Sequence, residues 1–342
     1  MKVAILGAGN IAKSMAAAVR GLQKRGEDVE PYAVGARELA RAEAFAKAEG
    51  FAKAYGSYEE LVSDPDVDLV YVATPHAMHY AHTKLALEHG KNVLCEKAFT
   101  MNAEQAGEVI RLAEEKGLLL TEAIWPRYMP SRQMILDLID SKVIGNVTSL
   151  SANLGYPLTH VERMVRPELC GGALLDLGVY PLNFACMAFP GDIKDVASTC
   201  VKWETGVDAQ NSFTLTFEDG RMAVLYSSML VQSDRLGVIN GDKGYIEVQN
   251  INNPEEIRIF DLGRTCIRTI PVPEQINGYE YEVMACKEAL ENGWKECPQM
   301  PHSETIRMMK VMDSLRKSWG VMYPMEQSSC SADGTGSAAS RR

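Results

Sequence analysis

The sequence predicts an α/β protein in two parts, a doubly wound parallel sheet followed by an α+β part with a mostly antiparallel sheet. Residues 1–123 alternate short β-rich runs with helical patterns, which is typical of buried parallel strands joined by right-handed crossovers. From about residue 145 the runs become longer and alternate apolar with polar residues, as in antiparallel strands with one solvated face. These two textures carry the prediction.

The first part contains five candidate strands, each short, apolar and separated from the next by a helical pattern. They are KVAILG (2–7), VEPYAVG (29–35), VDLVYVAT (67–74), KNVLCEK (91–97) and GLLLTEA (117–123). The stretches between them have apolar residues at i, i+3 and i+4, as helices do. Several of these stretches end on glycine, which is a frequent helix C-cap. We therefore expect residues 1–123 to form one domain of repeated βα units.

The second part, residues 124–327, is predicted to form one α+β domain. Its candidate strands are VTSLSANLGY (147–156), VASTCVKWE (196–204), NSFTLTFEDGRMAVLYSSML (211–230), KGYIEVQ (243–249) and EEIRIFDL (255–262). Within the third of these, Gly220 in EDGR is expected to form a hairpin turn. Helical patterns at 278–293 and 303–319 close the domain. The Gly/Ser-rich residues 328–342 are expected to be a disordered tail.

Composition and charge narrow the class of protein. The chain of 342 residues is long enough for two domains, and 46% hydrophobic with 23% charged residues is a globular balance. A formal net charge of -10 argues against nucleic acid or an anionic membrane as a partner and favours small molecules. The eight cysteines form no CxxC pair, and nowhere do about 18 apolar residues run together. We expect a cytoplasmic protein without a disulfide framework.

The strongest motif is ILGAGNIA (5–12), which follows the first predicted strand and opens a helix. Gly7, Gly9 and Ala12 give the spacing G-x-G-x-x-A, with Asn10 and Ile11 at the helix start. Glycines at this position let the backbone approach a pyrophosphate, whose charge the helix N-terminus stabilises. A tight turn without a ligand is the alternative, but the βα units that follow favour a dinucleotide site.

The end of the second strand indicates which dinucleotide binds. An NAD site usually ends this strand on an acidic residue for the ribose 2′-OH, whereas this strand ends in VGAR (34–37). Because a guanidinium suits a 2′-phosphate, Arg37 favours NADP(H). NAD(H) stays open as an alternative, since Arg37 could be a solvated residue and Glu38 could reach a ribose.

Three histidines follow the third strand in ATPHAMHYAH (73–82). Successive steps of three residues on a helix turn by about 300°, so only neighbouring pairs of His76, His79 and His82 share a face. No carboxylate or thiolate completes a ligand set, and we expect no metal site. The residues of this segment expected beside the cofactor are Thr74, Pro75, His76 and His79.

Two charged residues, Glu96 and Lys97, end the fourth strand, where an apolar run would be expected to continue. Ligands of doubly wound sheets bind beyond the carboxyl ends of the strands, so both charges are expected to face the nicotinamide cleft. A lysine there can hydrogen-bond a substrate oxygen and lower the pKa of a neighbouring acid. A surface lysine after a strand is the simpler alternative.

The segment CGGALLDLGVYPLN (170–183) carries a second pair, Asp176 and Tyr180. Four residues apart on a helix, they share a face, and the preceding glycines permit close backbone approach. A phenol with a pKa of about 10 acts as an acid or base near neutral pH only if a cation such as Lys97 lowers that pKa. The alternative is a helix carboxylate and a core phenol.

Taken together, these segments resemble the Gfo/Idh/MocA oxidoreductases, and within them the branch of dihydrodiol and NADP-dependent D-xylose dehydrogenases. The resemblance covers about residues 1–185, in family order and spacing. The segments that carry it are GAGNIA (7–12), Arg37, ATPHAMH (73–79), CEKAFTMN (95–102), EAIWPRYMP (122–130) and GGALLDLGVYPLN (171–183).

The resemblance implies a Rossmann domain, a second domain with a large open antiparallel sheet, and a homodimer or higher homo-oligomer formed through that sheet. It implies reversible hydride transfer between NADP(H) or NAD(H) and a carbinol carbon of a sugar, polyol or vicinal diol. Tyr180 would be the acid/base, assisted by Lys97, and Asp176 would orient the substrate or the phenol. The residues expected to line the substrate pocket are Trp125, Arg127, Asp176 and Asn183.

Two positions depart from the family pattern. The family's EKP reads EKA here, so Ala98 removes a proline that would restrict Lys97 to an extended conformation. The second strand ends in GAR where NADP-dependent relatives often read S-R, so one hydroxyl contact to a 2′-phosphate would be missing.

Two other functions are alternatives to a dehydrogenase or reductase. One is a glycosidase that uses NAD transiently without net redox change. The other is a binding protein that senses a dinucleotide or a sugar, because related folds can lose their chemistry. The joint presence of Lys97, Asp176 and Tyr180 favours the oxidoreductase.

Overall fold

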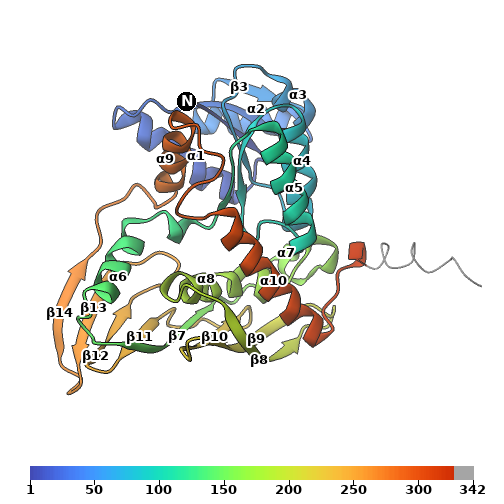
Figure 1. Cartoon of the computed structure of the whole chain (residues 1–342). Helices are drawn as coiled ribbons and strands as arrows, with labels where there is room; N and C mark the ends of the chain where they lie inside the picture. The colour runs from blue at the N-terminus through green and yellow to red at the C-terminus, as the bar shows by residue number, and fades with distance from the viewer. Residues whose placement is uncertain (327–342) are drawn as a thin grey trace, which may run out of the picture.

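The computed structural model describes residues 1–326, which contain two sheets with helices packed around them (Figure 1). The predicted tail, 328–342, lies outside the described residues. One sheet has six parallel strands and the other has eight mostly antiparallel strands, which confirms the fold class predicted from the sequence.

The first sheet has the strand order β3-β2-β1-β4-β5-β6. Its strands are β1 (Lys2–Leu6), β2 (Glu30–Gly35), β3 (Lys53–Tyr55), β4 (Leu69–Val72), β5 (Asn92–Glu96) and β6 (Leu120–Ala123). All neighbouring pairs are parallel, and the order reverses between β1 and β4, the switch point at which such sheets bind dinucleotides. Only β3, three half-buried residues long, was not predicted from the sequence.

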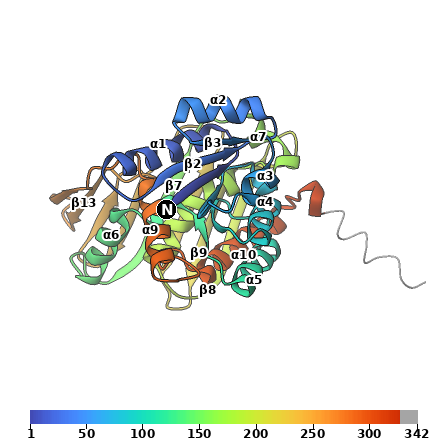
Figure 2. The same ribbon diagram turned by 90° about the horizontal axis from the view of Figure 1, so that it is seen from above.

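Five helices cover the two faces of this sheet. They are α1 (Asn10–Lys24), α2 (Leu39–Glu49), α3 (Tyr58–Ser63), α4 (His76–Glu88) and α5 (Ala103–Lys116). Figure 2 shows α1 and α2 on one side of the sheet and α4 and α5 on the other. Asn102 caps α5 by accepting a hydrogen bond from the Gln105 N–H, and Gly117 ends that helix in the left-handed conformation. The predicted glycine C-cap is therefore present.

The second sheet has the order β14-β13-β12-β11-β7-β10-β9-β8. Its strands are β7 (Val147–Gly155), β8 (Ile193–Lys202), β9 (Asp208–Phe217), β10 (Met222–Ser228), β11 (Gly237–Gly241), β12 (Gly244–Val248), β13 (Glu256–Asp261) and β14 (Cys266–Pro271). The central pair β7 and β10 is parallel. Gly220, with a φ of 85°, lies in the turn of the β9–β10 hairpin, as predicted.

Helices of the second part cover one face of this sheet, and the last two of them reach the helices of the first sheet (Figure 1). They are α6 (Pro130–Asp140), α7 (Glu162–Val165), α8 (Val179–Ala188), α9 (Glu280–Glu291) and α10 (His302–Trp319). A short turn at Trp125–Arg127 precedes α6, and another at Pro167–Leu169 follows α7. A π-helical turn at Leu174–Gly178 leads directly into α8. Since α9 packs on α1 and α10 packs on α5, the end of the described chain joins the two parts.

One segment of residues 1–326, Pro167–Ala188, is long and apolar enough to cross a membrane by length and composition. Within it, 94% of the most apolar window is buried inside the fold, and every residue of α8 is buried. A helix that is apolar on all sides is buried in the core of a protein as well as in membranes. Here the burial is that of a core helix.

A buried polar network ties α8 and α10 to the turn that follows β6. The Arg127 Nε donates a hydrogen bond to Asn183 of α8, and its Nη2 donates to Oε1 of Glu304 in α10 at 2.6 Å. Arg307 donates to the same carboxylate. Arg127 and Asn183 are almost fully buried and bind each other, so their contacts favour a structural role over the substrate-lining role expected from the sequence.

We predict that Arg127→Met lowers the free energy of unfolding by about 3 kcal/mol, because it leaves buried polar partners without the guanidinium. Urea unfolding measures the change. As a control, replacing the exposed Arg111 by methionine is expected to change stability by about 0.5 kcal/mol or less. A loss below about 1 kcal/mol for Arg127→Met would contradict the structural role.

Candidate active site

The glycine motif forms the turn between β1 and α1. Gly7 has a φ of +113°, and a Cβ there would lie 2.8 Å from the Ala73 carbonyl oxygen, so glycine is required. Gly9 precedes α1 in an extended conformation, a Cβ on it would meet only open space, and no side chain at this position caps the helix. Because the first N–H groups of a helix have no partner within the helix, this turn fits the pyrophosphate of a dinucleotide.

Two arginines lie beyond the end of β2. Arg37 is exposed there, as expected from the sequence, and Arg41 follows in the first turn of α2. Both lie near the phenol of Tyr58. Burial raises the pKa of this phenol, and the positive charges of the two arginines partly oppose the increase. The Arg41 Nη2 also donates to the Ala8 carbonyl oxygen at 3.1 Å, so this side chain reaches over the glycine turn. The sequence analysis missed Arg41, although its spacing of four from Arg37 was a usable signal.

His79 connects the loops that follow β4 and β5. Its Nδ1 lies 2.8 Å from the Ala98 carbonyl oxygen and its Nε2 lies 2.7 Å from the Thr74 carbonyl oxygen. Burial lowers the pKa of His79 to about 4, although both carbonyls favour the charged ring. The ring therefore bridges the loop after β4 and the loop that carries Lys97. Within the described residues, no group of three or more His, Cys, Asp or Glu side chains could hold a metal.

Lys97 and Asp176 meet where the two parts of the chain join. The Lys97 Nζ donates to Oδ1 of Asp176 at 3.0 Å and to the Asp176 carbonyl oxygen at 2.9 Å. Arg163 of α7 donates to Oδ1 at 2.8 Å and to Oδ2 at 3.3 Å. His76 Nε2 lies 3.8 Å from Oδ1. The predicted lysine and aspartate are thus in direct contact, together with an arginine that the sequence analysis missed.

The charges in this cluster are fixed by burial and by pairing. Burial alone would raise the pKa of Asp176, but the charges of Lys97 and Arg163 hold it far below its usual range. Burial lowers the pKa of His76 to about 3, so the imidazole is neutral. Two cations, Lys97 and Arg163, therefore contact one carboxylate. Their N–H groups can stabilise an oxygen that becomes negative during a reaction.

Tyr180 lies beside Lys97, but the amine faces its ring and not its hydroxyl. The Lys97 Nζ is 5.0 Å from the ring centroid, and the phenol oxygen accepts a hydrogen bond from Trp125 Nε1 at 3.1 Å. Burial raises the pKa of Tyr180 well above its usual value, and the charges of Glu96 and Asp176 raise it further. This differs from the expectation that Lys97 lowers the pKa, because the lysine charge is already paired with Asp176.

An aromatic wall and a buried carboxyl group complete the surroundings. Trp125 stacks on Tyr279, with ring centroids 4.5 Å apart and planes inclined by 11°. Tyr279 lies at the start of α9 in a segment without a motif, and the sequence analysis did not identify it. Glu96 accepts hydrogen bonds from the Tyr71 hydroxyl and the Lys97 backbone N–H. Burial raises the pKa of Glu96, whose contacts hold the strand end that presents Lys97.

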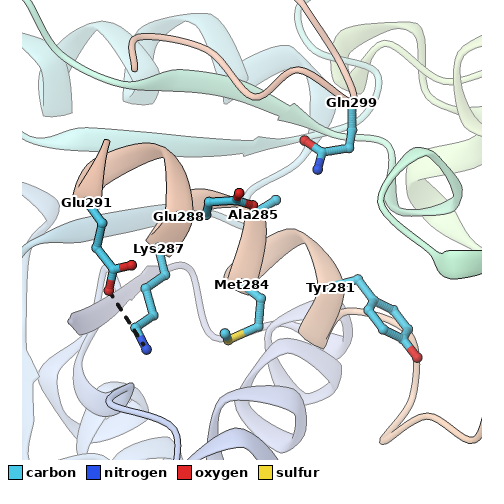
Figure 3. A pocket seen from close by; sticks show the side chains of 7 residues that line it. All are labelled: Tyr281, Met284, Ala285, Lys287, Glu288, Glu291 and Gln299. Carbon is cyan, nitrogen blue, oxygen red and sulfur yellow. Dashed lines mark ion pairs between the residues drawn. The ribbon is translucent and has the colours of Figure 1, made fainter. Parts of the chain in front are cut away.

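A separate cavity of about 320 Å³ lies along α9 (Figure 3). It is lined by Tyr281, Met284, Ala285, Lys287, Glu288, Glu291 and Gln299. Lys287 pairs there with Glu291, at 3.9 Å, and with Glu27. None of the residues of the Lys97 and Asp176 cluster lines this cavity, so it is not part of the candidate site.

Two family models match the chain. That of the oxidoreductase family with an NAD-binding Rossmann fold matches residues 1–124, and that of the GFO/IDH/MocA C-terminal domain matches residues 133–247. The trans-1,2-dihydrobenzene-1,2-diol dehydrogenase of Xenopus laevis is 36% identical over 307 residues, which cover 87% of this chain and 92% of that protein. The protein of that name from Homo sapiens is 33% identical over 330 residues, 94% of this chain and 98% of its own.

Solved structures share the fold over nearly the whole length. A levoglucosan dehydrogenase in complex with NADH and levoglucosan superposes with a TM-score of 0.84 at 16% identity, covering 94% of this chain and 97% of that one. A 3-ketoreductase from Actinomadura kijaniata, in complex with NADP and TDP-benzene, superposes with a TM-score of 0.83 at 25% identity, covering 93% and 97%. The chain belongs to the Gfo/Idh/MocA family and is an NAD(P)-dependent oxidoreductase.

Proposed function

We propose that the protein transfers a hydride between NADP(H) and a carbinol or carbonyl carbon of a vicinal diol, polyol or sugar. The observation that carries this proposal is the meeting of Lys97, an ionised Asp176 and the Tyr180 ring at the junction of the two parts. The names of the diol dehydrogenase relatives and the levoglucosan complex support the substrate class.

The described residues fit a dinucleotide along the carboxyl edge of the first sheet. A bound nicotinamide would supply the hydride or accept it. The turn at 7–12 would hold the pyrophosphate, and Arg37 with Arg41 would bind a 2′-phosphate. Preference for NADP(H) over NAD(H) rests on these two guanidinium groups. The residues proposed to border the nicotinamide are Thr74, Pro75, His76, His79, Glu96 and Lys97.

A substrate with two neighbouring hydroxyls suits the chemistry of the cluster. The Asp176 carboxylate accepts hydrogen bonds, whereas Lys97 and Arg163 donate them, so each hydroxyl of a diol finds both kinds of partner. The stacked rings of Trp125 and Tyr279 offer a flat apolar wall for the carbon skeleton. Together these groups would orient a ring that is polar at its edge and apolar on its face.

Tyr180 is proposed as the acid/base. Its oxygen accepts a hydrogen bond from Trp125, which leaves the phenol proton for a substrate oxygen. Since burial keeps this phenol protonated, it is ready to donate a proton to a carbonyl oxygen during reduction. In oxidation the phenol must first release its proton to solvent, and the resulting phenolate takes the proton of the hydroxyl, with the Lys97 charge beside the ring stabilising the phenolate.

Turnover is expected when NADPH is followed at 340 nm with diols, sugars and their carbonyl forms. Tyr180→Phe is predicted to lower kcat by about 100- to 10,000-fold because it removes the acid/base, while the Kd for NADPH stays within about twofold. Tyr80→Phe, which removes a surface phenol of α4, is the matched control and keeps kcat. Near-normal kcat for Tyr180→Phe would contradict the role. Release of an aglycone without net absorbance change would favour the redox-neutral glycosidase. Binding of NADPH without turnover of any substrate would favour the sensor.

The cofactor preference is tested by replacing Arg37 and Arg41 singly with alanine. Each change is predicted to raise the Kd for NADPH by about 10- to 100-fold, because one charge-assisted contact to the 2′-phosphate is lost. The Kd for NADH should change by less than about twofold, and Arg25→Ala at the other end of α1 serves as the control. Fluorescence titration measures the Kd for NADPH and the Kd for NADH in all three variants. An equal loss of affinity for NADPH and NADH would contradict the assignment.

We also propose that a second copy of the chain covers the bare face of the second sheet. Among residues 1–326, helices cover only the opposite face (Figure 1). On or near the bare face, Val201, Met222 and Val224 are exposed to 52%, 43% and 52%. Val224 lies in β10, near the middle of the sheet. An apolar sheet face of this kind favours a self-complementary interface.

Val224→Lys is predicted to convert a dimer into a monomer, because it places a charge in the middle of the proposed interface. Light scattering coupled to size exclusion gives the molar mass. Val143→Lys, in the turn after α6, is the control and leaves the dimer intact. A monomeric unmodified protein, or a Val224→Lys variant that stays dimeric, would contradict the proposal.

A further inference from the structure

Three polar side chains lie buried on the second sheet beneath the π-helical turn. Asp208 and Asn211 come from β9, and Ser227 comes from β10. The Ser227 hydroxyl donates to Asn211 Oδ1 at 2.9 Å, and Asn211 Nδ2 donates to Asp208 Oδ2 at 2.8 Å. All three are at most 2% exposed. We call this chain of hydrogen bonds the Asp208 triad.

The triad holds the start of the segment that carries the proposed active-site residues. Leu174, the first residue of the π-helical turn, donates its backbone N–H to Asp208 Oδ2 at 2.7 Å. Ala173, which precedes the turn, has no capping side chain of its own. Asp208 therefore supplies the hydrogen-bond acceptor that a helix start requires. Asp176 follows two residues later, and Tyr180 lies one turn further on.

Glycines bring this segment into direct contact with the triad. Gly172 has a φ of +122°, and a Cβ there would collide with Asp208 Oδ1. A Cβ on Gly178 would lie 2.9 Å from the Ser227 hydroxyl oxygen. Side chains at either position would lift the turn from the sheet. The fit explains why the segment around Asp176 carries glycines, and it leaves the turn little freedom to shift.

The burial of Asp208 lowers the stability of the fold. It forms no ion pair in residues 1–326, and its Oδ1 has no hydrogen-bond partner there. Burial raises the pKa of Asp208 to about 7, against the effect of the Leu174 N–H and of Asn211. A buried carboxyl group without full satisfaction costs stability, and an apolar side chain would avoid that cost. Despite this cost, Asp208 is present and contacts the segment that carries Asp176, through the Leu174 backbone N–H.

We propose that Asp208 is a positioning residue, which fixes the start of the π-helical turn and thereby the places of Asp176 and Tyr180 relative to Lys97. This inference rests on the roles proposed above for those three residues. Asp208 itself touches none of their side chains in the contacts described, so it acts through the Leu174 backbone. A shift of about 1 Å at a reacting group is enough to lower a rate about 100-fold.

The test compares two carboxylates that hold helix starts. Asp208→Ala removes the acceptor for Leu174, and Asp313→Ala removes the carboxylate that accepts the Ala103 N–H at 2.8 Å at the start of α5. We expect Asp208→Ala to lower kcat by about 10- to 100-fold per NADPH-binding site, with the Kd for NADPH unchanged. Asp208→Asn keeps an oxygen for Leu174 and is expected to restore kcat to within about threefold. Asp313→Ala is expected to keep kcat while losing stability.

A spectroscopic readout keeps the test independent of turnover. The indole N–H of Trp125 donates to the Tyr180 hydroxyl, so the indole resonance of Trp125 in a nitrogen-15 correlation spectrum reports where Tyr180 lies. Trp125→Phe assigns this resonance. Asp208→Ala is expected to shift it, whereas Asp313→Ala leaves it in place. If the unmodified protein showed no turnover with any substrate, the proposed function would fail and the resonance would still decide the positioning role.

The outcomes separate cleanly. An Asp208→Ala variant that keeps kcat per site within about twofold and leaves the Trp125 resonance unmoved would overturn the proposal. If that variant does not fold, Asn211→Ala takes its place, because it removes one donor to Asp208 and the acceptor for Ser227. It is expected to lower kcat about three- to tenfold and to shift the resonance. An unmoved resonance and unchanged kcat in Asn211→Ala would likewise overturn it.

Discussion

The ion pair between Lys97 and Asp176 is the contact on which the rest of the site depends. Lys97 directly follows β5 of the parallel sheet, and Asp176 lies in the π-helical turn above the antiparallel sheet, so the pair joins the two parts of the chain. Both side chains are largely buried, and each compensates a charge that would otherwise be costly in this environment. Arg163 adds a second cation that contacts the same carboxylate. The pair thus sets both the geometry and the charge that a substrate oxygen would meet.

Each partner of this ion pair is held by its own support. On the side of the first sheet, His79 contacts the Ala98 carbonyl oxygen, and Glu96 accepts the Lys97 N–H, so the loop after β5 is fixed from two directions. On the side of the second sheet, the turn that carries Asp176 rests on Asp208. The glycine turn at 7–12 lies at the same carboxyl edge as Lys97, because the carboxyl ends of parallel strands meet there. The two sheets therefore bring together, at their junction, the groups that we propose to bind cofactor and substrate.

The sequence predicted those features that a local pattern encodes. Most strands of both sheets follow hydrophobic periodicity, and the glycine turn and the Lys97, Asp176 and Tyr180 set are recognisable as motifs. Strands β3, β11 and β14 were missed because they are short, glycine-bounded or exposed. Arg163, Tyr279 and Asp208 lie in segments without a motif, and their contacts depend on the tertiary fold, whereas the spacing of Arg41 from Arg37 was a signal that was not used. The raised pKa of Tyr180 was also hidden, since it follows from burial and from the pairing of Lys97 with Asp176, neither of which spacing reveals.

A double-mutant cycle tests most directly whether Lys97 and Asp176 act as one unit. It compares kcat for Lys97→Met, Asp176→Asn and the double variant, each normalised to the number of NADPH-binding sites. We predict strong non-additivity, with a coupling of about 1–3 kcal/mol and a double variant no slower than the slower single variant, because either change already breaks the same unit. Additive losses, with the double variant slowed by the product of the two single effects, would contradict the account.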